Sequence, residues 1–504
     1  MRKTITANIL FSGIGAQERG FENTGLFDVH VLHTSEINKE AVLAYAAVHK
    51  GLTEEMIDTY KKYPSEEQMA ADLLQMNLGY DSDKSKPFNW YRLCKHNTQM
   101  LKKYWLANHL CNNLGDISLI QELPYADLWT TSFPCQDISV SGAMRGFTVG
   151  SSTRSSLLWE SIRLLKNAVS DGTAPKFLLF ENVKNLVSKK FYDDFCKLIE
   201  LLEELGYNTY WQVLNGKDCG IPQNRERVFV LAVRKDVDTG LFEFPQAFDS
   251  GWRAYHFLDD EVDNKYIYKA ETPITFFDGV GNVKCVRKLT SKECWRLMGF
   301  TDIDYENARN VGLSESSLYK QAGNSIITNC VSLIAEHMYK AFYDVEFKCT
   351  DTYFADTAFI CATDNKPRLV GGIGQKNYGK QYRQGNRVYS AENVAMACLA
   401  QPIGNAGGNS YLYAIPEITT PNSLIQVGTI DNEKWRESRR RIYSPVGCIP
   451  ALHGIGAGGN TEPKIVVDDT YKGREARLYS DYVPTLRAER AGFKVIHVED
   501  GVHD

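Results

Sequence analysis

Short runs of apolar residues alternate with segments of helical periodicity along the first two thirds of the chain. An apolar run bounded by turn-forming residues is typical of a buried strand, and five such runs lie at residues 9–11, 29–33, 127–131, 177–180 and 228–233. Strands that alternate with helices predict an α/β fold with a doubly wound, mainly parallel sheet. Because ligands bind beyond the carboxyl ends of the strands in such sheets, polar residues that directly follow these runs are candidate functional residues.

A polar stretch rich in Lys and Glu separates the second apolar run from the third. It has helical patterning between Tyr45 and Gly115, and a turn-like segment at residues 81–87 interrupts it. We interpret residues 46–114, approximately, as a helical insertion at the edge of the sheet. A functional role for this insertion is the alternative.

The pattern changes after about Phe342, where helical periodicity gives way to short β-prone runs and Gly-rich turns. The tetrapeptide Arg-x-Tyr-Ser occurs at residues 387–390, 441–444 and 477–480, and Gly-Gly-Asn follows the first two copies. These features predict a second, smaller, mostly β, Gly-rich domain with weak internal repeats over residues 345–504. The first domain then covers residues 1–344.

Composition excludes several classes of protein without naming a function. A length of 504 residues favours two or more domains, because single hydrophobic cores stop growing at roughly 250–300 residues. No apolar run is long enough to span a bilayer and the N-terminus leads into a strand-like segment, so we expect neither a membrane span nor a signal peptide. The 12 cysteines include no Cys-x-x-Cys pair, which indicates a reducing cytoplasm and argues against disulfides and a metal site. The net charge of −5 neither supports nor excludes nucleic acid binding.

Three features favour a nucleoside-binding site. Residues 11–15, Phe-Ser-Gly-Ile-Gly, form a Gly-rich turn after the first strand, where glycines let the backbone approach a ligand closely. Glu36 ends the next strand, where an acid can bind ribose hydroxyls, and Asp116 can accept a hydrogen bond from an adenine amino group. The alternatives are a tight turn without a ligand, a solvated loop acid and a helix N-cap.

A second group of residues carries candidate chemistry. Cys135 follows a buried strand. A lone cysteine is usually a small hydrophobic core residue, but at the carboxyl end of a strand it can instead be a thiolate of lowered pKa. Residues 139–146 are small and Gly-containing, as in a mobile active-site loop. Glu181 ends another apolar strand, and Arg225 and Arg227 share one face just before the last strand. The two arginines are suited to hold a phosphate or a carbonyl oxygen, or they form a solvated edge.

Taken together, the motifs stand in the order of the DNA (cytosine-5) methyltransferases, and the chain resembles that family in its bacterial or phage type. The resemblance covers residues 5 to about 340, without the insertion, and includes a segment at 287–300 that supports the recognition domain in the family. It implies the Rossmann-like fold of class I S-adenosylmethionine-dependent methyltransferases. The matching motifs are Phe-Ser-Gly-Ile-Gly at 11–15, Pro-Cys-Gln at 134–136, Glu-Asn-Val at 181–183, Gln-Asn-Arg-Glu-Arg at 223–227 and Gln-Ala-Gly-Asn-Ser at 321–325.

The resemblance implies a mechanism. Cys135 would add to carbon 6 of a cytosine flipped out of double-stranded DNA, which activates carbon 5 to take the methyl group of S-adenosylmethionine. Glu181 would hold N3 and the exocyclic amine, and Arg227 would bind the carbonyl at position 2 with support from Arg225. The loop from Gln136 to about Thr153 would close over the base.

The resemblance also implies which residues form the two binding sites. The expected cofactor-binding residues are Phe11, Gly13, Gly15, Glu36, Ile37, Asp116, Ile117, Pro134, Asn324 and Ser325. The expected substrate-binding residues are Gln136, Ser139, Asn182 and Gln223.

The chain departs from the family pattern in two places. The interval from Glu36 to Asp116 is unusually long, which is the reason for placing an insertion there. Family members usually carry target recognition between the 223–227 motif and the 287–300 segment, but here residues 235–286 look mostly like connecting structure. The repeats after residue 344 look like recognition segments of other members. We therefore expect recognition in residues 345–504, with an unrelated accessory domain as the alternative.

Two other functions remain open from the sequence. One branch of the family methylates tRNA with the same core, and a DNA-binding regulator with an inactive core is a possibility from another class. Intact Cys135, Glu181 and Arg227 argue against the regulator. We expect a monomer on DNA, in the cytoplasm of a bacterium or of a phage-infected cell. A cognate restriction endonuclease that acts separately is a further expected partner.

Overall fold

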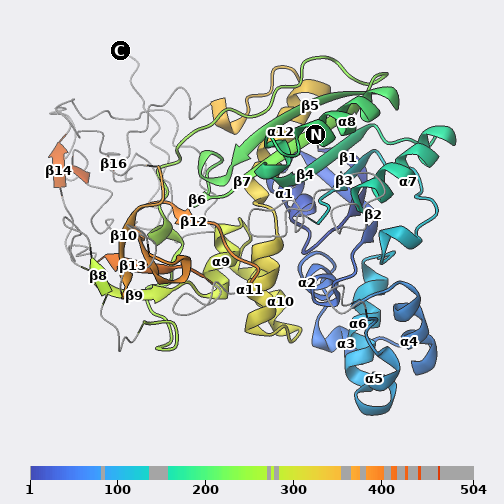
Figure 1. The fold of residues 1–504 in the computed structure, drawn as a ribbon, viewed down its shortest axis with the longest axis horizontal. Helices are drawn as coiled ribbons and strands as arrows, with labels where there is room; N and C mark the ends of the chain where they lie inside the picture. The colour runs from blue at the N-terminus through green and yellow to red at the C-terminus, as the bar shows by residue number, and fades with distance from the viewer. Residues whose placement is uncertain are drawn as a thin grey trace, which may run out of the picture.

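A computed structural model describes residues 2–80, 86–134, 157–268, 274–276, 283–352, 365–374, 382–401, 410–416, 426–429, 441–443 and 464–465 (Figure 1). Its main feature is a six-stranded sheet in the order β2-β1-β3-β4-β7-β5. The strands are β1 (Lys3–Leu10), β2 (Phe27–Ser35), β3 (Leu128–Thr131), β4 (Phe177–Val183), β5 (Tyr207–Asn215) and β7 (Glu226–Arg234). Strands β2, β1, β3 and β4 are parallel, and β7 runs antiparallel to both β4 and β5.

Both faces of this sheet are buried under helices, as the doubly wound prediction requires. Along β7, Val228 and Val230 belong to one apolar cluster, whereas Phe229 and Leu231 belong to another. The first cluster includes α7 (Leu158–Ser170) and α8 (Tyr192–Glu204), and the second includes α1 (Ala16–Thr24), α2 (Lys39–His49) and α12 (Thr328–Phe342). Because side chains alternate across a strand, the residues of an uninterrupted apolar run pack against the helices on both faces of the sheet. The predicted fold class is confirmed.

The sequence pattern missed one strand of this sheet. β5 lies at the edge, next to β7, and its middle positions Trp211 and Gln212 are exposed. An edge strand that is covered on one side has no continuous apolar run, so the pattern that revealed the central strands is absent. The first strand is also longer than predicted at its start, and Phe11 lies beyond its end in a left-handed conformation, with a φ of 57°.

The stretch between residues 46 and 114 contains four helices that lie together beside the sheet (Figure 1). They are α3 (Glu54–Thr59), α4 (Glu66–Gln75), α5 (Trp90–His96) and α6 (Thr98–Leu110). Trp90, which is fully buried, is at the centre of this group. None of the helices in the described part of the chain is long and apolar enough to cross a membrane.

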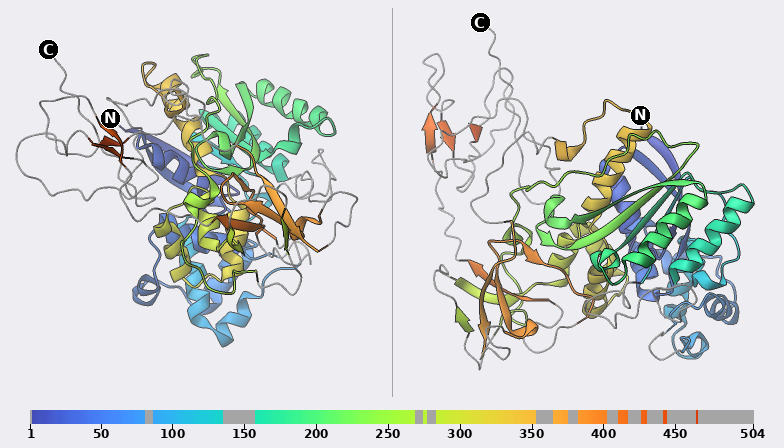
Figure 2. Two further views of the ribbon diagram at one scale, coloured as in Figure 1. Left: turned by 90° about the vertical axis from the view of Figure 1, so that its left-hand side faces the viewer. Right: turned by 45° about the horizontal axis from the view of Figure 1, so that its top comes forward.

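A second sheet of five strands lies beside the first, as the right-hand view of Figure 2 shows. Its order is β8-β10-β11-β13-β9, with β8 (Ile274–Phe276), β9 (Val283–Lys288), β10 (Leu369–Ile373), β11 (Arg387–Ser390) and β13 (Leu412–Pro416). The first Arg-x-Tyr-Ser copy is β11. The second copy begins with β15 (Arg441–Tyr443), which pairs with β14 (Gln426–Thr429) and β16 (Lys464–Ile465). The third copy lies outside the described residues.

Strands from both sides of residue 344 share the five-stranded sheet. β9 pairs with β13, so that Val286 lies opposite Ala414, and β12 (Ala395–Met396) pairs with β6 (Gln223–Asn224). The interval 235–286, expected to be mostly connecting structure, therefore supplies β8 and the start of β9. Between the two sheets lie α9 (Ser291–Leu297), α10 (Asp302–Asn310) and α11 (Glu315–Asn324) (Figure 1).

The segment at 287–300 joins β9 to α9 through a buried ion pair. The guanidinium of Arg287 donates to both carboxylate oxygens of Glu293, at 2.8 and 2.9 Å, and the two residues are 3% and 0% exposed. Glu293 also accepts from the backbone of Thr290 and so caps its own helix. A buried pair is stable when further hydrogen bonds satisfy its remaining polar atoms, as here.

Candidate active site

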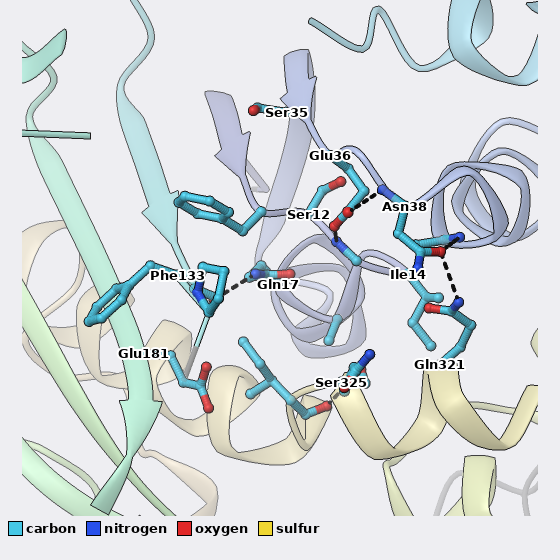
Figure 3. Close-up of a pocket in the computed structure, with 18 of the residues that line it drawn as sticks. Ser12, Ile14, Gln17, Ser35, Glu36, Asn38, Phe133, Glu181, Gln321 and Ser325 are labelled. Atoms are coloured by element: carbon cyan, nitrogen blue, oxygen red, sulfur yellow. Dashed lines mark hydrogen bonds between the residues drawn. The ribbon is translucent and has the colours of Figure 1, made fainter. Parts of the chain in front are cut away.

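The candidate site is a cavity of about 270 Å³ at the carboxyl ends of β1, β2, β3 and β4 (Figure 3). In register, Leu10 lies beside Ser35 and Thr131, and Thr131 lies beside Phe180, so the loops after all four strands meet at one edge. α11 closes the cavity from the opposite side. The lining includes Phe11, Gly13, Glu36, Ile37, Asp116, Ile117, Pro134, Glu181, Asn182, Arg225, Arg227, Asn324 and Ser325.

The reversed direction of β7 brings the two arginines to this edge. β7 is antiparallel to β4, so the start of β7 lies where β4 ends, and Arg227 is opposite Val183. Residues that precede β7 therefore reach the same cavity as residues that follow the parallel strands. The alternative of a solvated edge is excluded, because Arg225 is 5% exposed and the Arg227 side chain is 19% exposed.

Glu181 and Arg227 form an ion pair inside the cavity. The Nε of Arg227 lies 3.0 Å from Oε1 of Glu181, which is 9% exposed. Burial raises the pKa of the Glu181 carboxyl above its usual value, and the positive charges of Arg227 and Arg225 partly oppose that shift. A buried carboxyl of raised pKa holds a proton more readily than a solvated carboxyl does. The adjacent guanidinium can bind a carbonyl oxygen or a developing negative charge.

Arg225, expected to support the carbonyl site of Arg227, lines the cavity and is also hydrogen-bonded within the protein, so its part in catalysis stays a prediction. Its guanidinium donates to the carbonyl oxygens of Gly323 (2.9 Å), Ser325 (2.7 Å) and Cys398 (3.2 Å). Arg225 therefore ties the end of α11 to the start of β7 and to the segment after β12. Its charge still acts on Glu181 through space.

Gln223, expected to bind substrate, is hydrogen-bonded at both ends of its amide. It is fully buried and is not among the residues that line the cavity. Its Nε2 donates to the carbonyl oxygen of Leu297 at 2.6 Å, and its Oε1 accepts from the backbone N–H of Cys398 at 3.0 Å. Gln223 therefore links β6 to α9 and to the segment after β12, and its contact with substrate stays a prediction.

Glu36 organises the Gly-rich turn. Its Oε2 accepts from the N–H of Gly13 at 3.0 Å, and its Oε1 accepts from the N–H of Asn38 at 2.7 Å. Burial raises the pKa of Glu36, and these backbone donors oppose that shift. The alternative of a solvated loop acid is excluded. Because each carboxylate oxygen accepts up to two hydrogen bonds, Glu36 can also accept from a ligand hydroxyl.

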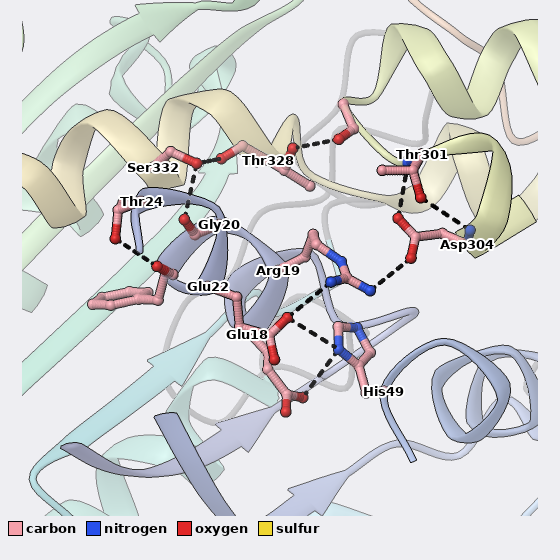
Figure 4. Close-up of polar contacts among 12 residues, drawn as sticks. Glu18, Arg19, Gly20, Glu22, Thr24, His49, Thr301, Asp304, Thr328 and Ser332 are labelled. Atoms are coloured by element: carbon pink, nitrogen blue, oxygen red, sulfur yellow. Dashed lines mark hydrogen bonds and ion pairs between the residues drawn. The ribbon is translucent and has the colours of Figure 1, made fainter. Parts of the chain in front are cut away.

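Gly15 packs against α2 and does not line the cavity. Its φ of 81° is left-handed, and a Cβ there would lie 2.2 Å from Nε2 of His49 and 2.9 Å from Tyr45. His49 is held in place because its Nε2 lies 3.2 Å from the carbonyl oxygen of Ile14. Figure 4 shows Nδ1 of His49 facing the carboxylates of both Glu18 and Glu22 of α1. These contacts dock α2 against the Gly-rich turn.

Asp116 lines the opposite side of the cavity and also caps a short helix. Its Oδ1 accepts from the N–H of Ser118 at 3.0 Å and from the Ser118 hydroxyl at 2.8 Å. The cap expected as the alternative is therefore present, and Asp116 also lines the cavity. Glu36, Ile37, Asp116 and Ile117 give this end of the cavity two carboxylates and two apolar side chains. Carboxylate acceptors suit the hydroxyls and amine of a nucleoside, and apolar side chains suit its ring.

Asn182 positions the segment that leads to Cys135. Its Nδ2 donates to the carbonyl oxygen of Phe133 at 2.9 Å, and Asn182 is 2% exposed. Pro134, the next residue, lines the cavity. Cys135, Gln136 and Ser139 lie outside the described residues.

Comparison with known proteins identifies the family of the chain. The model of the C-5 cytosine-specific DNA methylases matches residues 75–266 and 252–340, more than half of the chain. The chain belongs to this family. It is therefore a methyltransferase that acts on carbon 5 of cytosine in DNA.

Individual relatives agree with this assignment. Type II methyltransferase M2.ScrFI of Lactococcus lactis subsp. cremoris is 34% identical over 367 residues, which cover 66% of this chain and 98% of the relative. Orphan methyltransferase M.Rho11sI of Bacillus phage rho11s is 26% identical over 475 residues, which cover 91% of this chain and 68% of the relative. A solved structure of the S. pombe Dnmt2 methyltransferase is similar with 17% identity and a TM-score of 0.40, over 67% of this chain and 98% of that chain.

Asn38 and Gln321 are among the cavity residues of this methylase that the sequence did not single out as site residues. Asn38 caps α2 by accepting from the N–H of Ala41, and its Oδ1 also accepts from Nε2 of Gln321 at 3.3 Å (Figure 3). The pair links α2 to α11 across the cavity. Asn38 follows Glu36 by two residues and has the residue type of an N-cap, so the capping signal was available. The contact with Gln321 joins residues 283 positions apart and has no local signal.

The Gly-rich turn yields a matched test of packing. We expect Gly15→Ala to lower the free energy of unfolding by more than Gly13→Ala does. Both positions have a positive φ, which costs an alanine roughly 1–2 kcal/mol. At Gly13 a Cβ meets no atom within 4 Å, whereas at Gly15 it overlaps His49, which adds about 1–3 kcal/mol of overpacking. Urea unfolding of both variants measures the difference, and equal losses would contradict the close approach of α2.

Proposed function

We propose that this chain methylates carbon 5 of cytosine within a specific sequence of double-stranded DNA, with Cys135 as the nucleophile and S-adenosylmethionine as the methyl donor. The buried pair of Glu181 and Arg227 carries the proposal. It puts a proton-holding carboxyl and a fixed cation 3.0 Å apart in the cavity that the segment before Cys135 also lines. A pyrimidine that reacts by addition at carbon 6 needs both groups.

The cofactor fits the other end of the cavity. S-adenosylmethionine supplies an electrophilic methyl group on a positively charged sulfur. Glu36 would accept from its ribose hydroxyls and Asp116 from its adenine amine, while Phe11, Ile37 and Ile117 would contact the ring. Gly13 and Asn324 would bring backbone close to it, and Ser325 ends α11 beside it. The two carboxylates and the apolar side chains at this end of the cavity support this orientation.

Cys135, Glu181 and Arg227 would each have a separate role in the reaction. The Cys135 thiolate would add to carbon 6 of the flipped cytosine, and the electron pair displaced from the 5,6 double bond would form the bond from carbon 5 to the methyl group. The bond from the methyl group to the sulfonium sulfur would break at the same time, with its electron pair left on the neutral thioether of S-adenosylhomocysteine. Glu181 would hold the proton at N3 while this charge develops. Arg227 would bind the carbonyl oxygen at position 2. Loss of the carbon 5 proton to a base then expels the Cys135 thiolate and restores the double bond.

Recognition of the target sequence is assigned here to residues 345–504 together with β8 and β9. Base readout needs side chains delivered to a groove, and phosphate contacts need nearby Lys or Arg. The five-stranded sheet and the repeats support this assignment, because β9 and β13 form one structural unit across residue 344. On this proposal, the recognition region takes in β8 and β9 from residues 1–344, and the rest of that range is the catalytic domain.

The biological setting follows the two relatives. A type II enzyme from a bacterium and an orphan enzyme from a phage are both similar to this chain. We propose a monomer that modifies DNA in the cytoplasm of a bacterium or a phage-infected cell, with or without a cognate restriction endonuclease that acts separately.

The nucleophile is tested by a covalent trap. We expect DNA with 5-fluorocytosine at the target position to form an adduct with the wild-type protein that survives denaturing electrophoresis. Fluorine cannot leave carbon 5 as a cation, so Cys135 stays bonded to carbon 6 after methyl transfer. Cys135→Ala should form no adduct. It should keep less than about 1% of the methyl transfer activity, because loss of the nucleophile should raise the activation free energy by roughly 3 kcal/mol or more.

The matched control is Cys196→Ala, a cysteine on α8 that does not line the cavity. It should form the adduct like the wild type. Binding of S-adenosylmethionine, measured by calorimetry, should be nearly unchanged in both variants. An adduct that persists in Cys135→Ala would remove Cys135 from the mechanism.

The cofactor orientation is tested at Glu36. We expect Glu36→Ala to weaken S-adenosylmethionine binding by roughly 1.5–3 kcal/mol, or about 10- to 150-fold, because hydrogen bonds to a charged group are lost. Calorimetric titration measures the affinity, and Glu55→Ala, at an exposed acid on α3, is the control. Unchanged affinity in Glu36→Ala would show that the ribose lies elsewhere.

A further inference from the structure

The turn at residues 76–79, in the stretch interpreted as a helical insertion, contacts two residues that line the cavity, Ile37 and Asp116. It follows α4, and both Asn77 and Gly79 are left-handed, with φ values of 55° and 77°. Trp90, which is fully buried, donates from its Nε1 to the carbonyl oxygen of Leu78 at 2.9 Å. The turn is therefore fixed to the core of the insertion.

One side of the turn holds Asp116. The N–H of Asp116 donates to the carbonyl oxygen of Met76 at 3.0 Å, and the Nδ2 of Asn77 donates to Oδ2 of Asp116 at 2.9 Å. The preceding Gly115 packs so closely that a Cβ would lie 2.2 Å from the carbonyl oxygen of Met76. Both the backbone and the side chain of Asp116 are thus set by the insertion.

The other side of the turn holds the segment after Glu36. The N–H of Gly79 donates to the carbonyl oxygen of Ile37 at 2.6 Å. Ile37 and Asp116 line the same cavity, so this four-residue turn contacts the backbone of both. The insertion therefore sets the separation between these two cavity residues.

We propose that Asn77 is a positioning residue for adenine recognition, an inference that rests on the proposed cofactor orientation. Ser118 occupies both acceptor positions of Oδ1 on Asp116. Asn77 occupies one position of Oδ2, which leaves one position on Oδ2 for an amino group of the ligand. Asn77 thereby fixes the rotation of the carboxylate and the direction from which a purine amine can donate. A purine with a carbonyl oxygen in place of the amine meets an acceptor and is rejected.

The test compares two ligands that differ at that group, S-adenosylhomocysteine and S-inosylhomocysteine, by calorimetric titration of the full chain. The wild type should bind the adenosyl ligand more tightly. Asn77→Gly accommodates the left-handed backbone and removes the amide. It should weaken the adenosyl ligand by about 3- to 10-fold, the range of one hydrogen bond, and change the inosyl ligand little.

Two further variants sharpen the test. Asn77→Asp places a carboxylate against Asp116 and should weaken the adenosyl ligand further than Asn77→Gly. The matched control is Asn112→Gly, because Asn112 is also left-handed, with a φ of 45°, and donates its amide to Leu32 away from the cavity. Asn112→Gly should leave both affinities unchanged.

The outcomes separate the inference from the function that it rests on. If Asn77→Gly weakens both ligands equally, or neither, Asn77 does not position Asp116 and the inference is wrong. If the wild type binds neither ligand, or binds both equally, the proposed cofactor orientation is wrong as well.

Discussion

The guanidinium of Arg225 lies where three segments of the chain meet, and the cavity depends on it. A buried guanidinium is stable only when its N–H groups find acceptors, and this one donates to Gly323, Ser325 and Cys398. These contacts fix the end of α11 against the start of β7. As a result, Ser325 reaches the cofactor end of the cavity while Arg227, two residues further along the chain, reaches Glu181. One side chain thus sets the distance between the two halves of the site.

The same interaction connects the site to the region after residue 344. Gly323 has no room for a side chain, because a Cβ there would lie 2.0 Å from the backbone nitrogen of Ala400. β12 pairs with β6 directly before Arg225, and Gln223 accepts from Cys398. The region proposed to read DNA is therefore in contact with the motif that supplies Arg227. A shift of this segment would move the residues that hold the base, which gives recognition a short physical route to catalysis.

The sequence revealed those parts of the fold and site that have local signals. Central strands such as β7 are continuous apolar runs, and Glu36 and Glu181 directly follow such runs, so both the sheet and its functional edge were predicted. The edge strand β5 was missed because its exposed positions break the apolar pattern. The contacts of Arg225 and Gln223 were not predicted, because their partners lie about 70–175 positions away along the chain. A motif gives the residue type, but the competing acceptors appear only in the folded chain.

The helical insertion shows the same limit. From the sequence it was an interruption of the family pattern, and nothing local connects Asn77 to Asp116, 39 positions later. In the folded chain it contacts Ile37 and Asp116, which line the cavity. The cavity is thus built from the short motifs and from a segment between them.

Bisulfite sequencing of DNA from cells that express the wild-type chain or Cys135→Ala tests the central claim most directly. Cytosines methylated at carbon 5 resist conversion, so the account predicts protected cytosines within one short sequence context in the wild-type sample and none there in Cys135→Ala. Complete conversion in both samples, or the same protected sites in both, would contradict a sequence-specific methyltransferase that uses Cys135.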